Sequence, residues 1–311
     1  MKKITKWATA GVAAAALAGG ALFAPAMLAP EPEVSPVAIA PHLRDFPGPD
    51  NTGVPEGTVL TPYTGSCTIN PTDTPLNLDG KIVNCDRFFI QGTGHRITRS
   101  IINGRVVVEE DNPLGERSII ITDSEIHRGD YELQGLSSGN FTAIRVEVTG
   151  GNSGIMCMRN CSVIDSWIHG QMDDPSGQAH ESGIRVGQRA IIRGNTITCD
   201  ATPYPPDAGC SANLTMYGDL GIPEYNLIEG NFITGSDHAG TMGYCAYGGA
   251  AHWDEYGQYS NHITFKDNVF GRGVSGICGI WGPISSFDSD APGNVWENNV
   301  YEDGVPIPPS M

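Results

Sequence analysis

The chain has 311 residues and a formal net charge of −17, and only 17% of its residues are charged. An acidic chain has no electrostatic attraction for nucleic acid or for anionic membranes, so we expect neither as a partner. Capture of an acidic polysaccharide would need a bridging cation such as Ca²⁺, although no feature of the sequence requires a cofactor. The length suits one large domain.

Residues 1–26 are predicted to be a secretory signal peptide. Three lysines precede an apolar run, and Ala-Pro-Ala at 24–26 supplies a small-x-small cleavage pattern. The run contains two glycines and no basic stop follows it, so we expect a removed signal, no membrane insertion and a secreted, extracellular protein. Residues 27–48 are rich in Pro, Ala and Glu and are expected to form a linker.

The cysteines all follow the predicted signal, and there are eight of them. An even number in an exported chain favours disulfides, with buried free thiols as the alternative. The pairs suggested by position are Cys67–Cys85, Cys157–Cys161, Cys199–Cys210 and Cys245–Cys278. No combination of His and Cys spacing matches a zinc site.

One short phrase recurs from residue 95 onward, in forms such as HRITRSII, SIIITDSEI, NLIEGNFI and NVWENNVY. The last apolar residue of each copy is a landmark, and the landmarks are Ile102, Ile126, Val148, Ile168, Ile197, Ile233, Phe270 and Tyr301. The residue five positions before each landmark is apolar, and the residue two positions before is Ser or Asn in seven of eight copies. Agreement at fixed offsets indicates internal repetition.

The repeat predicts an all-β fold. The first landmarks are 20 to 24 residues apart, which suits one coil of a parallel β-helix whose coils stack about 4.8 Å apart. Equivalent residues then form ladders, with apolar side chains inside and Asn or Ser at a tight corner. We predict a parallel β-helix of about eight or more coils over residues 49–304, followed by a Pro-rich tail at 305–311.

The recurrent phrase, together with FPGPDNTGVPEGTVL and ANLTMYGDLGIPEYNLIEGNFITG, resembles the secreted, pectin-lyase-like right-handed β-helix proteins of bacteria. The resemblance covers roughly residues 46–304. It implies a right-handed solenoid and a polysaccharide or glycan as the partner. The superfamily includes lyases, hydrolases, phage depolymerases and members without an assigned activity, so the resemblance does not select a reaction.

Later landmarks are farther apart than early ones, and the extra residues fall in 169–188, 198–219, 234–260 and 271–292. Because the landmarks stack, we expect these segments to gather into a wall beside the strands and to form a groove for an extended polymer. The wall is polar and aromatic, and it includes Asp219, His252, Trp253 and Trp281.

The first of these segments contains the catalytic candidates, which are Asp173, Asp174, His180, Glu181 and Arg185. Hydrolysis of a glycosidic bond needs one protonated and one ionised carboxyl group. Elimination needs a base, for which Arg185 or His180 is a candidate, and a positive group that neutralises a uronate carboxylate. The turn-forming sequence DDPSG is equally well explained as a plain turn.

The later segments supply the expected substrate-binding residues, because aromatic faces stack on sugar rings and polar side chains hydrogen-bond hydroxyl groups. These residues are Tyr217, Asp237, His238, Tyr244 and Tyr247. Ca²⁺ held by Asp173, Asp174 or Asp237 is the metal alternative.

The predicted function is cleavage of a glycosidic bond in a polysaccharide, by lyase or hydrolase chemistry. Two alternatives remain open. One is a non-catalytic carbohydrate-binding or surface-adhesion protein, and the other is a phage-derived depolymerase or spike component, which the signal peptide disfavours.

Overall fold

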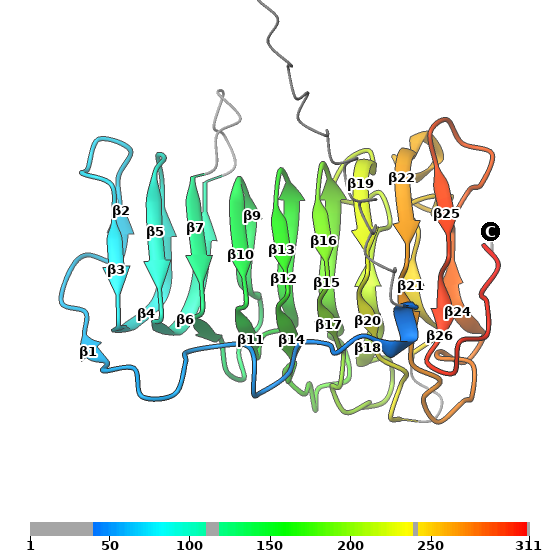
Figure 1. Cartoon of the computed structure of the whole chain (residues 1–311), viewed down its shortest axis with the longest axis horizontal. Helices are drawn as coiled ribbons and strands as arrows, with labels where there is room; N and C mark the ends of the chain where they lie inside the picture. Colours follow the sequence, from blue (N-terminus) through cyan, green and yellow to red (C-terminus); the bar gives the residue numbers. More distant parts are fainter. Residues whose placement is uncertain (1–39, 110–117, 239–241, 310–311) are drawn as a thin grey trace, which may run out of the picture. The chain divides into compact units, whose positions relative to one another are not determined.

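The computed structural model describes residues 40–109, 118–238 and 242–309. The predicted signal peptide and most of the predicted linker lie outside these residues. The described chain is all-β with two long sheets in which the strands pair in parallel, as in a parallel β-helix. Figure 1 shows the strands stacked side by side from β3 to β25. None of the helices in the described ranges is long and apolar enough to cross a membrane.

One sheet has nine strands, and every strand after the first holds the apolar residue that lies five positions before a landmark. In stacking order its strands are β3 (Asn77–Asp79), β5 (His95–Thr98), β7 (Ile119–Thr122), β10 (Phe141–Ile144), β13 (Ser162–Ile164), β16 (Ile191–Arg193), β19 (Glu224–Glu229), β22 (Asn261–Lys266) and β25 (Val295–Glu297).

The second sheet has 17 strands in two ladders. The landmark ladder contains β8 (Glu125–His127), β11 (Glu147–Thr149), β14 (Trp167–His169), β17 (Thr196–Ile197), β20 (Phe232–Ile233), β23 (Val269–Phe270) and β26 (Val300–Tyr301). The groove ladder contains β9 (Gln134–Gly139), β12 (Ser153–Arg159), β15 (His180–Gln188), β18 (Gly209–Thr215), β21 (Tyr244–Tyr247) and β24 (Gly282–Ser285).

The remaining elements lie near the ends of the stack. The long strands β4 (Lys81–Ile90) and β6 (Ile101–Val108) pair with each other, and β6 pairs with the first strand of both ladders. The short strands β1 (Thr61–Pro62) and β2 (Thr68–Ile69) pair with β4. Two 3₁₀ helices are η1 (Pro41–Leu43) and η2 (Gly257–Tyr259).

The register of the repeat is the one that the fixed offsets predict. All eight landmarks pair with their neighbours along one continuous ladder, from Ile102 to Tyr301. The residues five positions earlier pair in the same way, from Ile97 to Trp296. Both rows point into one core of buried Ile, Val and Phe side chains.

Asn side chains stack at the corner between the nine-stranded sheet and the landmark ladder. The backbone N–H of Asn195 donates to Oδ1 of Asn231 over 3.0 Å, and the N–H of Asn231 donates to Oδ1 of Asn268 over the same distance. Each amide also bonds a carbonyl of the coil below, as Asn231 Nδ2 does to Ile192 O. The buried polar backbone of the corner is therefore satisfied by the repeat itself.

The segments expected to be insertions have more structure than the sequence suggested. Each contains one strand of the groove ladder: 169–188 contains β15, 198–219 contains β18, 234–260 contains β21 and 271–292 contains β24. These strands carry few regularly spaced apolar residues, so they lacked a recognisable repeat. The loops on either side of these strands form the walls.

The eight cysteines form four disulfides, in the pairs that their positions suggested: Cys67–Cys85, Cys157–Cys161, Cys199–Cys210 and Cys245–Cys278. A chain with four disulfides is typical of an oxidising, extracellular environment.

The C-terminal end of the stack is covered. Residue Ile307 of the Pro-rich tail is buried, and its carbonyl accepts a hydrogen bond of 2.7 Å from Nε1 of Trp296. Residues 40–48 belong to the expected linker but contact later coils, away from the first strands of the stack. There Phe46 packs on Phe232, and the Pro47 carbonyl accepts a bond from the Thr196 hydroxyl.

Candidate functional site

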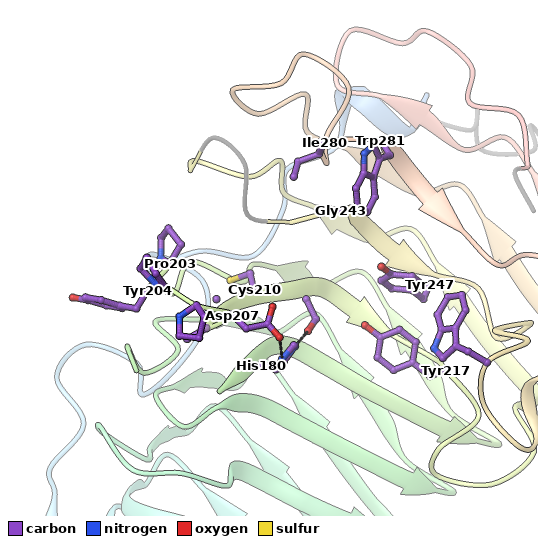
Figure 2. Close-up of a pocket in the computed structure, with 16 residues that line it drawn as sticks. His180, Pro203, Tyr204, Asp207, Cys210, Tyr217, Gly243, Tyr247, Ile280 and Trp281 are labelled. Atoms are coloured by element: carbon purple, nitrogen blue, oxygen red, sulfur yellow. Dashed lines mark hydrogen bonds and ion pairs between the residues drawn. The ribbon is translucent and has the colours of Figure 1, made fainter. Parts of the chain in front are cut away.

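A groove lies on the outer face of the groove ladder. Its larger part, a cavity of about 790 Å³, is lined by residues of β15 and β18 and by the loops around β21 and β24. A second part of about 330 Å³ continues it, and both parts share His180, Ser211 and Tyr217. The expected wall of loops thus encloses a hollow that crosses several coils (Figure 2).

Two disulfides anchor the loops that border the groove. The Cys199–Cys210 bond closes the loop that carries residues 203–208, and Tyr204 and Ala208 pair across it. The Cys245–Cys278 bond ties β21 to the loop that carries Ile280 and Trp281. These cross-links restrict the loops, so the side chains on them are held in place before any ligand binds.

Aromatic side chains form one wall of the groove. The rings of Tyr217 and Tyr247 have centroids 4.7 Å apart, and Trp253 lies 6.0 Å from Tyr247 in an edge-on arrangement. Tyr244 joins Tyr247 to Trp281, with centroid distances of 5.8 and 5.7 Å. Trp253 and Trp281 are 58% and 68% exposed. Large aromatic faces left in contact with water are suited to stacking on sugar rings.

Two carboxyl groups and one guanidinium lie in the smaller part of the groove. Arg185, on β15, is paired with Asp219, and Asp254 lines the same cavity. Burial and the negative charge of Asp219 raise the pKa of Asp254, and the charge of Arg185 opposes this shift. The two carboxyl groups therefore lie in different environments, one paired with a guanidinium and the other with a raised pKa.

His180 is at the start of β15, where its side chain is exposed in the groove. Its Nε2 lies 3.2 Å from Oδ2 of Asp207, and its Nδ1 lies 3.4 Å from Oγ of Ser211. Figure 2 shows His180 and Asp207 on one side of the groove, with Tyr217 and Tyr247 on the other. Burial raises the pKa of the Tyr217 hydroxyl, so this hydroxyl remains protonated and can donate a hydrogen bond.

Glu181 does not share the groove with its neighbour His180. Its side chain has no exposed surface, and neither carboxyl oxygen has a hydrogen-bond partner. Burial raises the pKa of Glu181 to about 7. The nearby backbone N–H groups of Glu181 and Gly209 lower the pKa in part, although neither forms a hydrogen bond of normal geometry with the carboxyl group. The structure thus separates these two catalytic candidates, one in the groove and one beneath it.

The adjacent aspartates Asp173 and Asp174 hold loops together. Asp174 accepts bonds from the Ser176 hydroxyl and from the backbone N–H groups of Gln178, Ala179 and Ser176, and these bonds lower the pKa of its carboxyl group. Asp173 accepts a bond of 2.7 Å from the N–H of Thr202 on the next coil. The turn interpretation of DDPSG describes these contacts, and neither carboxylate lines the groove.

The substrate-binding candidates divide into two groups. Tyr217 and Tyr247 line the groove. Tyr244 packs against Trp281, which also lines it. Asp237 and His238 lie on the loop after β20 and are absent from the lining of both parts of the groove.

Asp207, Ser211 and Asp254 are polar residues of the groove that the sequence did not identify. Asp254 lies within a segment that was expected to form the wall, and its place beside the aromatic pair His252–Trp253 was the only indication of a role. Asp207 and Ser211 reach His180 only because β18 stacks on β15, with His180 opposite Gly209. Because His180 and Ser211 are 31 positions apart, no local sequence pattern reveals their contact.

Among the described residues, no group of three or more His, Cys, Asp or Glu side chains is placed to hold a metal ion. The three aspartates considered for Ca²⁺ are not among such a group.

Comparisons with protein-family models, with curated proteins and with solved structures found no match for this chain.

Proposed function

We propose that the chain is a secreted, right-handed parallel β-helix of about eight or more coils, similar to the pectin-lyase-like superfamily. The continuous ladders and the four disulfides support this assignment. Crossover connections between parallel strands of one sheet are right-handed in about 98% of cases, which supports the handedness.

The groove, we further propose, binds an extended polysaccharide and hydrolyses a glycosidic bond in it. The observation that carries this proposal is the placement of an aromatic wall beside two carboxyl groups in different environments, one paired with Arg185 and the other with a raised pKa. Tyr217 belongs to the wall and also lines the cavity that holds Asp219 and Asp254. A sugar stacked on the wall would bring its glycosidic oxygen toward those carboxyl groups.

In this mechanism the proton on Asp254 is transferred to the leaving glycosidic oxygen, because the raised pKa keeps this group protonated at higher pH than an ordinary aspartate. Asp219, which is paired with Arg185, then assists water or stabilises the positive charge that develops on the sugar ring. The Tyr217 hydroxyl donates a hydrogen bond to a sugar oxygen.

The charges of the groove favour a glycan without uronate groups. Asp207, Asp219 and Asp254 line it, and the one arginine among the described residues that line it, Arg185, is neutralised by Asp219. A uronate chain would meet net negative charge here, and the chain as a whole is acidic. The paired arginine is also a poor base for elimination, which leaves His180 as the candidate base, and the negative charge of the groove favours hydrolysis over lyase chemistry.

A non-catalytic glycan-binding protein is the second candidate. The exposure of Trp253 and Trp281 supports it, because two open stacking faces suffice for retention of a sugar chain without any reaction.

The test is a screen of the purified protein against neutral and acidic polysaccharides, with and without Ca²⁺. Release of reducing ends without ultraviolet absorbance from an unsaturated product supports hydrolysis. Absorbance from such a product would replace hydrolysis with elimination. Retention on an immobilised polysaccharide without cleavage would favour the binder, and neither retention nor cleavage on any polysaccharide would contradict the proposal.

A further inference from the structure

The contacts of His180 are not used by the hydrolysis of the glycosidic bond. The imidazole lies between a carboxylate and a hydroxyl group, with Asp207 on Nε2 at 3.2 Å and Ser211 on Nδ1 at 3.4 Å. An Asp207 carboxylate at Nε2 favours the tautomer that carries its proton there. Nδ1 is then unprotonated and able to accept the proton of the Ser211 hydroxyl.

The backbone directs Ser211 toward this position. In the pairing of β15 with β18, Glu181 is opposite Cys210 and Ser182 is opposite Ala212, so Ser211 is the extra residue of a β-bulge. A bulge changes the direction in which a side chain points, and bulges are frequent beside active sites. Cys210, immediately before the serine, is fixed to Cys199 by a disulfide.

The same disulfide loop presents the carboxylate. Asp207 is in the stretch closed by the antiparallel pairing of Tyr204 with Ala208, and its N–H donates to the carbonyl of Gly177 over 3.1 Å. Asp207, His180 and Ser211 all line the larger part of the groove. A nucleophile, a base and a group that orients the base are thus within reach of the same bound molecule.

We propose that Ser211, His180 and Asp207 form a second catalytic centre in the groove, which hydrolyses ester substituents on the bound sugar chain. The assignment of the ester to a polysaccharide rests on the proposed function. The assignment of Ser211 as the nucleophile does not depend on it. An O-acyl group is suitable because it is a neutral, reactive carbonyl that a groove with net negative charge does not repel.

The reaction has two halves. Ser211 Oγ forms a bond to the ester carbonyl carbon while its proton passes to Nδ1 of His180, and the bond to the sugar oxygen then breaks as His180 returns the proton to that oxygen. Water attacks the acyl-serine, gives its proton to His180, and the acid leaves as the proton returns to Ser211. The sum consumes one ester and one water and gives one acid and one hydroxyl group.

The experiment uses the full chain with two probes that need no glycan, p-nitrophenyl acetate for turnover and a fluorophosphonate for labelling. We expect a fluorophosphonate adduct on Ser211 by peptide mass spectrometry, and at least about a hundredfold slower ester hydrolysis in Ser211→Ala and in His180→Gln. Ser275→Ala, an exposed serine outside the groove lining, is the matched control and should keep the wild-type rate.

Thermal unfolding of each variant establishes that it is folded. If Ser211→Ala does not fold, His180→Gln still tests the proposal. An adduct on another serine, or ester hydrolysis equal in wild type and both variants, would overturn the proposal. Comparison of an acetylated polysaccharide with its deacetylated form separates the two proposals. Release of acetate without chain cleavage supports the esterase alone, and chain cleavage without release of acetate contradicts it while leaving the proposed function intact.

Discussion

The two sides of each coil differ in how they use equivalent positions. At the corner beside the nine-stranded sheet, Asn195, Asn231, Asn268 and Asn299 repeat the same hydrogen bonds from coil to coil. On the groove ladder, one row of paired residues reads Ser137, Met156, Arg185 and Thr215. The repeated hydrogen bonds at the corner stabilise the stacking of the coils. On the groove ladder equivalent positions are not repeated, so each coil can place a different type of side chain in the groove.

The largest effect on stability is expected at the corner. Asn231→Ala removes four hydrogen bonds, two accepted from Asn195 and one donated to each of Ile192 O and Asn268. At about 1 kcal/mol each, the free energy of unfolding falls by roughly 4 kcal/mol, which denaturant titration measures. Glycan retention by the folded variant should be unchanged. The exposed Asn84→Ala is the control, and an equal loss there would show that the ladder is unimportant.

On the groove side, stability depends on cross-links instead of repetition. Replacement of Cys245 and Cys278 by Ala opens a loop of 33 residues and should lower the free energy of unfolding by about 3.7 kcal/mol. The same change at Cys157 and Cys161, 4 residues apart, should cost about 1.9 kcal/mol. Calorimetry of both double variants tests the order, and a greater loss at the shorter loop would contradict it.

Beneath the groove, the buried carboxyl of Glu181 makes stability depend on pH. Its folded pKa of about 7 exceeds the ordinary value of 4.5, so the folded protein binds this proton more tightly than the unfolded chain does. Stability from this group is therefore present at low pH and is lost as pH rises through 7. Glu181→Gln should unfold with a free energy within about 1 kcal/mol of wild type near pH 5, and be more stable by roughly 3 kcal/mol near pH 8.

Denaturant titrations at both pH values measure this difference, with the exposed Glu56→Gln as the control. A Glu181→Gln variant less stable than wild type near pH 8 would show that the carboxylate is ionised and well paired in the folded protein.

The smallest effect is expected on the aromatic wall. Trp281 is mostly exposed, so Trp281→Ala should leave the unfolding midpoint unchanged and weaken retention on a polysaccharide by about fivefold, or about 1 kcal/mol. Affinity electrophoresis measures the change. Tyr131→Ala, an exposed aromatic outside the groove lining, is the control, and equal weakening by both variants would argue against a specific wall.

The sequence predicted the regular side of the molecule far better than the groove. The landmarks and the corner residues were recognisable because equivalent positions in each coil have the same surroundings and are occupied by the same type of residue. The groove strands β18, β21 and β24 were treated as insertions, because GCSANLT, YCAY and GPIS share no pattern.

The residues of the site were likewise predicted only in part. Tyr217, Tyr247, His180 and Arg185 were recognised by residue type within the extra segments, and they line the groove. Residues such as Ser211 depend on a bulge and on the stacking of distant strands, which only the folded chain reveals.

The most direct test of the central claim compares reducing-end release by wild type and Asp254→Asn. The measurement uses a polysaccharide that the wild-type protein retains. The account predicts release by wild type, a loss of about 10²- to 10⁴-fold in Asp254→Asn, and unchanged retention of the polysaccharide. Equal release by the two proteins would contradict the assignment of Asp254 as the acid, and no release by wild type would leave the groove a binding surface.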